Sequence, residues 1–395
     1  MAEQHRVNMA RSEFEFRAPT RLVVGRAALG RLGGLARELG ATRVLVVSDS
    51  GIIAAGHTAA GIAAIEAAGL VTATFSEFTE NPSAREVDEG TRFARDFRPD
   101  LLVGLGGGSS MDCAKGINFL LSCGGRIHDY KGRGTATGPM LPSIAVPTTA
   151  GTGSETQSFA LITDDESGMK MACGDPRAAF RIAILDVNLT LTQPRALAAL
   201  TGIDALSHAV ESHVSRAATP ASRTFSREAW RLLARGLPDI FMDGGSIAVR
   251  EDVQFGAALA GFAIENAMLG AAHALANPLT ATHGIVHGQA VGVMLPHVVR
   301  FNVRSPDGDA CAAGYGELLA DIGIQATAAE AGDRLADWLA RLLQSSGLET
   351  SLSACGCGHA DAHTLATAAA AQWTAGFNPR VVTAADLALL YEAAR

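Results

Sequence analysis

The stretch Asp100-Leu-Leu-Val-Gly-Leu-Gly-Gly-Gly-Ser-Ser-Met-Asp112 holds the clearest indication of the fold. Its apolar first half is typical of a strand buried on both faces of a sheet, and a helix is expected to begin after the glycines. Glycines between a strand and a helix let the backbone approach a diphosphate, because free N–H groups at the helix start face the anion. The run is not the Gly-x-Gly-x-x-Gly fingerprint of dinucleotide sites, so a tight turn is the alternative interpretation.

The same alternation of strand and helix extends over residues 14–187. Strands are predicted at 43–48 and 71–75, a helix at 51–68, and a capping box at Ser83-Ala-Arg-Glu86 that opens a helix to about Phe97. The pattern predicts an α/β domain, residues 1–187, with a Rossmann-like parallel sheet that binds ligands at the carboxyl ends of its strands.

Two further groups at predicted strand ends suit a nucleotide. Asp49 is placed to accept hydrogen bonds from an adenosine ribose, where its charge would favour NAD over NADP. A simple helix N-cap is the equal alternative for Asp49. The stretch Ala145-Val-Pro-Thr-Thr-Ala-Gly-Thr-Gly-Ser-Glu155 offers hydroxyl donors to a phosphate or ribose, although hydroxyl-rich turns are also common without function.

The texture changes past about residue 188 to long alanine-rich segments without apolar β-runs. Helices are predicted at 193–214, 220–236, 247–270, 308–322, 326–346, 360–375 and 383–394. We expect residues 188–395 to form an all-α second domain.

One helix of this half carries ionisable residues on a single flank. Asp204 and His208 are four residues apart, so both side chains project from the same side, away from an apolar stripe. Further along the chain, His273, His283 and His287 lie among small apolar residues. Imidazoles together with one carboxylate are a plausible shell for Fe(II) or Zn(II), although a lone buried histidine is more often structural.

Composition excludes several classes of function. The chain of 395 residues has a net charge of −8, which argues against binding to a nucleic-acid backbone. No apolar run reaches the roughly 18 to 20 residues of a membrane span, and no signal core follows the charged N-terminus, so a cytoplasmic protein without membrane contact is expected.

The cysteines need a separate remark. Six cysteines are few for this length and indicate reduced thiols. Cys355, Cys357, His359 and His363 could ligate zinc, but their spacing fits no standard finger, so a solvated turn before a helix is preferred.

From about Val23 to Tyr391 the chain resembles the iron-containing, or group III, alcohol dehydrogenases of the wider dehydroquinate synthase-like superfamily. The resemblance is carried by the Gly106–Asp112 and Pro147–Glu155 stretches, by Gly202-Ile-Asp-Ala-Leu-Ser-His208, by His273 and His287, and by Asn378-Pro-Arg380. It implies that Asp204, His208, His273 and His287 hold a divalent metal, Fe(II) first and Zn(II) second. It further implies a homodimer or higher homo-oligomer. NAD binding is implied around Asp49, Asn81, Gly107, Gly108, Ser109, Thr148, Thr149, Thr152 and Lys170.

The chain departs from the family at one position. Many members carry a second histidine, discussed as a proton relay, where this chain has Asn277, and an amide cannot exchange a proton as imidazole does. We hypothesise that His283, water or a cofactor ribose hydroxyl takes over this catalytic step. Alignment places Phe159, Ile264, Trp373 and Thr374 in the substrate pocket, although core packing would explain them equally.

The expected reaction is metal-dependent, NAD-linked hydride transfer between a small or medium primary alcohol and its aldehyde (or ketone). The first alternative is a sugar-phosphate cyclase-type lyase of the same superfamily, which would need several cations near the metal to hold a phosphate. The second alternative is a non-catalytic binding protein that retains the fold.

Overall fold

A six-stranded parallel sheet forms the centre of the first half of the chain. The computed structural model describes residues 13–304 and 308–395. The strands lie in the order β1-β9-β6-β4-β2-β3, with every neighbouring pair parallel. Their bounds are β1 Arg21–Val24, β2 Arg43–Val47, β3 Val71–Phe75, β4 Leu101–Gly106, β6 Ser143–Pro147 and β9 Ile182–Leu185. The predicted parallel Rossmann-like sheet is therefore confirmed.

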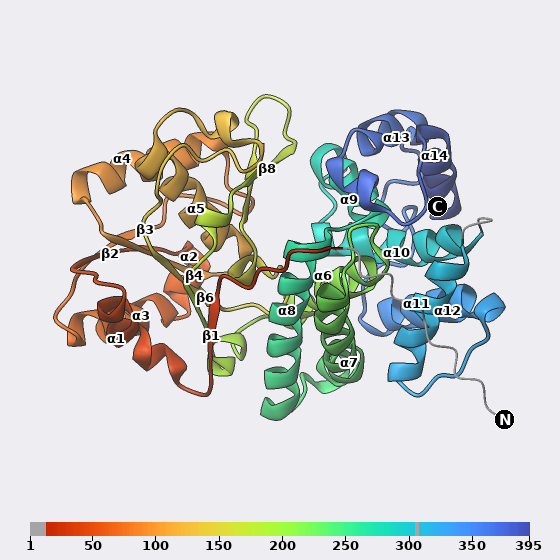
Figure 1. Ribbon diagram of the computed structural model, residues 1–395, viewed down its shortest axis with the longest axis horizontal. Helices are drawn as coiled ribbons and strands as arrows, with labels where there is room; N and C mark the ends of the chain where they lie inside the picture. Colours follow the sequence, from red (N-terminus) through yellow and green to blue (C-terminus); the bar gives the residue numbers. More distant parts are fainter. Residues whose placement is uncertain (1–12, 305–307) are drawn as a thin grey trace.

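Helices cover both faces of this sheet (Figure 1). Their bounds are α1 Leu32–Glu38, α2 Ser50–Ala54, α3 His57–Ala67, α4 Ala84–Phe97 and α5 Gly108–Cys123. Val44 and Val46 pack in the same cluster as residues of α1 and α3, whereas Leu45 and Val47 pack in the cluster that contains residues of α4 and α5. Successive strand residues point to opposite faces, so a strand covered on both sides must be apolar throughout.

Local signals behave mostly as expected in this half. The Ser83 capping box is present, with Ser83 Oγ accepting the Glu86 N–H and the Glu86 carboxylate accepting the Ser83 N–H. The helix predicted at 51–68 is instead two helices, α2 and α3, because Gly56 adopts a φ of 81° between them. A smaller sheet follows, in which β7 (Phe159–Thr163) pairs antiparallel with β8 (Lys170–Gly174), and β5 (Gly132–Arg133) pairs with β8.

Among the described residues, the second half contains helices and no strand, as predicted, and it lies beside the α/β half (Figure 1). Two of its helices, α9 and α10, were not foreseen, and the helix predicted at 247–270 ends at Ala267 because Met268 has a φ of 64°. The helices are α6 Arg195–Val214, α7 Pro220–Asp243, α8 Ile247–Ala267, α9 Ala271–His283, α10 His287–Val303, α11 Asp309–Asp321, α12 Ala328–Ser345, α13 Ala362–Ala370 and α14 Ala384–Ala393. The short 3₁₀ helix η6, Trp373–Phe377, precedes α14.

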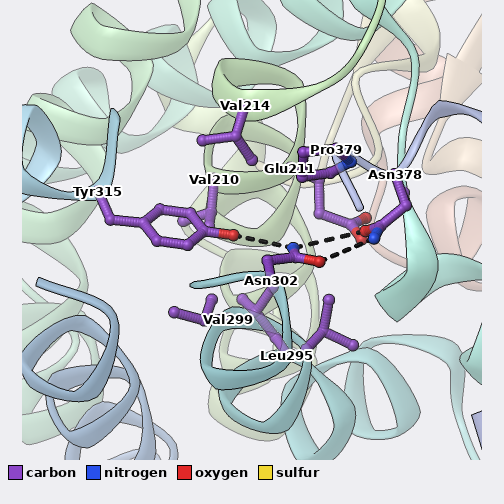
Figure 2. A pocket seen from close by; sticks show the side chains of 11 residues that line it. Val210, Glu211, Val214, Leu295, Val299, Asn302, Tyr315, Asn378 and Pro379 are labelled. Carbon is purple, nitrogen blue, oxygen red and sulfur yellow. Dashed lines mark hydrogen bonds between the residues drawn. The ribbon is translucent and has the colours of Figure 1, made fainter. Parts of the chain in front are cut away.

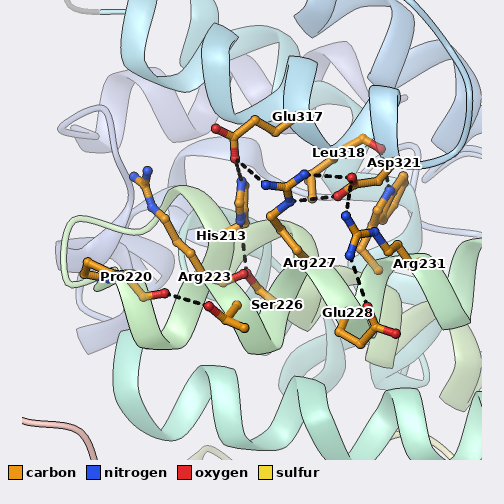
Figure 3. A network of polar contacts seen from close by, with 12 residues as sticks. His213, Pro220, Arg223, Ser226, Arg227, Glu228, Arg231, Glu317, Leu318 and Asp321 are labelled. Carbon is orange, nitrogen blue, oxygen red and sulfur yellow. Dashed lines mark hydrogen bonds and ion pairs between the residues drawn. The ribbon is translucent and has the colours of Figure 1, made fainter. Parts of the chain in front are cut away.

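A network of charged residues ties α6 and α7 to α11 (Figure 3). His213 is fully buried, with its ring nitrogens 3.0 Å from Ser226 Oγ and 3.2 Å from a Glu317 carboxylate oxygen. The nearly buried Asp321 carboxylate accepts hydrogen bonds from both Arg227 and Arg231. These contacts stabilise the packing of the helices, and none of the six residues lines the large cavity described below.

Backbone packs directly on backbone where the two halves meet. Gly153, before the short 3₁₀ helix η3 (Ser154–Thr156), lies against Gly261 of α8, and a Cβ on Gly261 would stand 2.6 Å from the Gly153 carbonyl oxygen. Thr156 Oγ1 donates to the Ala258 carbonyl at 2.9 Å. Glu265 accepts hydrogen bonds from the Ser158 N–H and hydroxyl, each at 2.8 Å. This contact between the two halves, which we call the glycine seam, therefore leaves no room for a side chain at Gly153 or Gly261.

No single helix among the described residues has the length and apolar character needed to cross a membrane. The pair α8 and α9 passes that test only when counted together, with a bend of 105° between them.

Candidate active site

The three helices α6, α9 and α10 bring one carboxylate and three imidazoles together. Asp204 Oδ1 lies 3.5 Å from His208 Nε2, 3.4 Å from His273 Nε2 and 3.8 Å from His287 Nε2. Asp204, His208 and His273 are buried, and His287 is partly exposed at the first position of α10. The flank of α6 that carries Asp204 and His208 is thus buried against the 273–287 segment.

Charge and burial act against each other in this cluster. Burial lowers the pKa of His208 to about 4 and that of His287 to about 3, so both imidazoles are neutral near pH 7. Burial also opposes protonation of His273, but the Glu211 and Asp204 carboxylates outweigh it and raise its pKa to about 9. Although burial disfavours its charge, the imidazoles hold the pKa of Asp204 well below its ordinary value, with His208 the strongest of them. Asp204 is therefore an anion.

The donor set fits a divalent metal. Asp204 Oδ1 and His273 Nε2 are buried without a hydrogen-bond partner among the described residues, and such atoms are normally paired. Asp204, His208 and His273 also form the one group of potential metal ligands found in residues 13–304 and 308–395 whose atoms lie within 4.8 Å of one another. Nitrogen and oxygen donors of this kind suit Fe(II) or Zn(II). The cysteines and histidines of 355–363 form no comparable group in the described structure.

A cavity of about 840 Å³ joins this cluster to the carboxyl edge of the parallel sheet. One end is lined by the start of α5 and by the loops after β2 and β6, and the other end by the four metal-ligand candidates. The nine residues expected to bind NAD all line it, namely Asp49, Asn81, Gly107, Gly108, Ser109, Thr148, Thr149, Thr152 and Lys170.

At the nucleotide end of the cavity, a ligand can come close to the backbone at the start of α5. Helix α5 begins at Gly108, and its N-cap Gly107 makes no side-chain cap. A Cβ on Gly108 would meet Thr152 Cγ2 at 2.8 Å, so any larger residue there would have to displace the Thr152 side chain. Thr148 and Thr149 have buried hydroxyls without a partner in the described residues. Free N–H groups at the helix start, unpaired hydroxyls and a backbone that a ligand can approach closely all suit a phosphate-bearing cofactor.

Asp49 is the N-cap of α2, the alternative interpretation of its sequence position, and it also faces the cavity. Its Oδ1 accepts the Gly51 and Ile52 N–H groups as the N-cap of α2, and its Oδ2 accepts the Ser110 hydroxyl at 2.9 Å. The carboxylate also lines the cavity. Lys170 lies further along the wall, where burial lowers its pKa despite the attraction of Asp112 and Asp204.

The residues expected around the substrate also line the cavity. Phe159, Ile264, Trp373 and Thr374 are all part of its wall, and the rings of Phe159 and Trp373 are 5.2 Å apart. Met268, Leu269 and Val286 add apolar surface that was not predicted. The positive φ of Met268 turns the chain between α8 and α9, and no sequence pattern announced it.

The hypothesis for His283 needs correction. His283 is exposed at the end of α9 and does not line the cavity. Its Nδ1 lies 2.6 Å from Oγ1 of Thr282, the preceding residue. Asn277 does line it, and its amide donates to Gln372 Oε1 at 3.0 Å. His283 is therefore too remote from the reaction site for a relay.

Sequence reasoning left Glu211 without an assignment, and the structure gives it a contact. Its Oε2 lies 2.5 Å from His273 Nδ1. The available signal was its position three residues after His208, on the flank that faces the metal cluster. Asp112, within the glycine stretch, is a second unassigned residue that lines the cavity.

A parallel α/β half that presents a phosphate-binding loop, joined through one cavity to a helical metal-ligand cluster, defines a metal-dependent, nucleotide-linked oxidoreductase. Comparisons with known proteins agree. Residues 19–187 match the family described as iron-containing alcohol dehydrogenase, and residues 198–395 match the C-terminal part of the Fe-containing alcohol dehydrogenase family. The chain belongs to the iron-containing alcohol dehydrogenase family.

Individual relatives match along nearly their whole length. An NAD-dependent methanol dehydrogenase of Bacillus methanolicus is 34% identical over 373 residues, covering 94% of this chain and 97% of the relative. A 1,3-propanediol dehydrogenase of Klebsiella pneumoniae is 32% identical over 384 residues, covering 96% and 98%. A solved structure of a 1,3-propanediol oxidoreductase has a TM-score of 0.93 at 30% identity and covers 97% and 100%. The protein is thus an NAD-linked alcohol dehydrogenase, and the sequence-based prediction of its activity and cofactors is confirmed.

Proposed function

We propose that the metal end of the cavity takes a small or medium primary alcohol with an apolar tail and interconverts it with its aldehyde (or ketone). The observation that carries the proposal is the shared cavity, since the same space touches the nucleotide loop and all four metal-ligand candidates. Hydride transfer requires the two reacting groups in one site with fixed orientation. The names of two relatives, which act on methanol and 1,3-propanediol, support a small substrate.

Each part of the cavity has a proposed role. Asp204, His208, His273 and His287 would hold the divalent metal, which when bound supplies a Lewis acid for the substrate oxygen, while NAD supplies the hydride acceptor. Phe159, Ile264 and Trp373, together with the buried Thr374, would form a mostly apolar wall beside the reacting carbon. Lys170 provides the positive charge on the wall between the nucleotide loop and the metal cluster.

The alcohol also loses a proton during oxidation. With Asn277 as a neutral amide and His283 outside the cavity, we assign the proton to water or to a cofactor ribose hydroxyl. The Asn277 side chain then acts as a hydrogen-bonding wall rather than as an acid or base.

The experiment combines metal analysis with turnover. Purified protein should contain a divalent metal and should change the NADH absorbance with members of an alcohol and aldehyde panel. His273→Ala and His287→Ala should lose both metal and turnover, whereas His283→Ala, a matched change at an exposed histidine, should keep both. Full turnover by a metal-free His273→Ala protein would refute the proposal.

The lyase alternative finds no support in the cavity. Apart from the imidazoles, Lys170 is the one cationic side chain among its described lining residues, and no arginine reaches it. A sugar phosphate would need several such donors.

The proposal extends to assembly, location and domain limits. We propose a homodimer or higher homo-oligomer, a cytoplasmic location and two domains that meet at residues 187 and 188. Strand β1 lies at an edge of the sheet and exposes Val24, and all six cysteines are unpaired thiols. Analytical ultracentrifugation tests the assembly, and a monomer would refute that part.

A further inference from the structure

The carboxylate of Glu211 is buried between two hydrogen-bond donors. Its side chain on α6 is 4% exposed, with Oε2 2.5 Å from His273 Nδ1 and Oε1 accepting the Ala272 N–H at 2.7 Å. A carboxylate has two acceptor oxygens and no donor, so it can serve both neighbours at once. An amide in its place has a single acceptor oxygen and would leave one donor facing an NH₂ group.

The contact with Ala272 replaces a missing helix cap. The N-cap of α9 is Gly270, which makes no side-chain cap. Instead, two distant residues accept the first N–H groups of the helix: Asn378 Oδ1 accepts from Ala271 at 3.2 Å, and Glu211 accepts from Ala272. A Cβ on Gly270 would stand 3.0 Å from both acceptor oxygens, which explains the glycine. The start of the helix that carries His273 is therefore held by side chains from elsewhere in the fold.

A buried amide network fixes the direction of these acceptors (Figure 2). Asn378 Nδ2 donates at 2.7 Å to Asn302 Oδ1 and to the Arg380 carbonyl, so its Oδ1 must face Ala271. Asn302 Nδ2 in turn donates to the Tyr315 hydroxyl at 3.0 Å. Asn302, Asn378 and Tyr315 are each at most 2% exposed. The Asn378-Pro-Arg380 stretch noted in the sequence thus holds the first turn of α9 through the hydrogen bond from Ala271 to Asn378.

We propose that Glu211 is a positioning residue for the metal site, acting through His273. By accepting the proton of His273 Nδ1 it selects the tautomer in which Nε2 carries the lone pair, and Nε2 is the atom that lies 3.4 Å from Asp204 Oδ1. By accepting the Ala272 N–H it also fixes the turn of helix from which His273 projects. One carboxylate therefore sets both the tautomer and the backbone position of a ligand. This inference rests on the proposed metal site.

The test measures metal affinity rather than turnover. Metal-stripped wild type and Glu211→Gln are titrated with Zn²⁺ against a competing chelator, and Co²⁺-loaded samples are compared by visible absorption. We expect Glu211→Gln to bind Zn²⁺ about 10- to 100-fold more weakly and to show a changed Co²⁺ spectrum. Glu265→Gln is the control, because Glu265 is equally buried and also accepts one backbone N–H and one side-chain hydroxyl, but away from the histidines; it additionally loses an ion pair with Arg133 at 3.5 Å, which makes it the harsher change.

The outcomes separate this inference from the function beneath it. Equal Zn²⁺ affinity in wild type and Glu211→Gln would overturn the inference alone, and so would an equal loss in Glu265→Gln. A wild type that binds no Zn²⁺ would overturn the proposed metal site as well. Glu211→Asp keeps both acceptor oxygens, so it should recover part of the affinity lost in Glu211→Gln. If Glu211→Gln does not fold, the Asp variant carries the test: its shorter side chain should still weaken binding, and undiminished affinity would overturn the inference.

Discussion

Asp49 allows a quantitative test of cofactor choice, because one substitution can remove its negative charge and keep its N-cap hydrogen bonds. Asp49→Asn keeps an oxygen that can accept the Gly51 and Ile52 N–H groups, and Asn and Asp are equally good N-caps. The free energy of unfolding should therefore change by less than about 1 kcal/mol. The negative charge on the cavity wall is lost.

The magnitude follows from Coulomb's law. A 2′-phosphate on a ribose bonded to this half-buried carboxylate would bring the two charges to roughly 5 Å, where repulsion is about 1 to 3 kcal/mol for effective dielectric constants of about 80 down to 20. We therefore expect the preference for NAD over NADP to fall by about 5- to 150-fold in Asp49→Asn.

The assay is the ratio of kcat/KM for NAD and NADP with one alcohol. Ser110→Ala is the control, since it removes the hydroxyl that donates to Asp49 Oδ2 but leaves the charge in place. Its ratio should stay near that of the wild type. An unchanged ratio in Asp49→Asn, with both proteins equally stable, would refute the assignment of Asp49 to the ribose.

Three further predictions concern other parts of the cavity and its supports. Asn277→His places an imidazole with an ordinary pKa near 6.5 in the wall, so kcat/KM should gain a pH dependence near that value, and a pH profile identical to that of wild type would contradict this. Burial raises the pKa of Glu155 to about 7 despite the attraction of Lys115, so its contribution to stability is present below its ordinary value of 4.5 and is lost as pH rises to about 7. Glu155→Gln should thus be more stable than wild type at pH 8 by up to about 3 kcal/mol and show no such gain at pH 4, as urea unfolding at both pH values would reveal. In Gly107→Ala the new Cβ meets only ordinary contacts with Thr149 at 3.5 Å, so thermal stability should hold while KM for NAD rises; an unchanged KM would place the cofactor away from this loop.

The parts of the fold that could be predicted are those where local pattern and tertiary burial agree. The strand 101–106 is apolar at every position because helices cover both faces of the sheet, and the Ser83 capping box marks the start of α4 correctly. Asp204 and His208 could be paired because four residues along a helix return to one flank.

The helices and residue roles that the sequence did not predict depend on tertiary contacts. Helices α9 and α10 contain Pro278 and Pro296 in their interiors, which local rules treat as helix breakers, yet burial of both prolines among other helices compensates. Because α9 was not recognised, the place of His283 could not be worked out. Ten residues of helix put it about 15 Å along the axis from His273 and on a different side. The role of Glu211 depends on a partner 62 residues away, which no local pattern contains.

The glycine seam between the two halves limits how this enzyme can diversify. Because Gly153 and Gly261 touch through their backbones, the spacing between nucleotide loop and metal cluster is fixed by main chain and cannot be adjusted by exchanging side chains. New substrate preferences would then arise from residues of the cavity wall, such as Ile264 or Trp373, while the spacing of the two halves stays constant. A chimera that joins one half of this chain to the other half of a relative should be active only when both seam positions remain glycine.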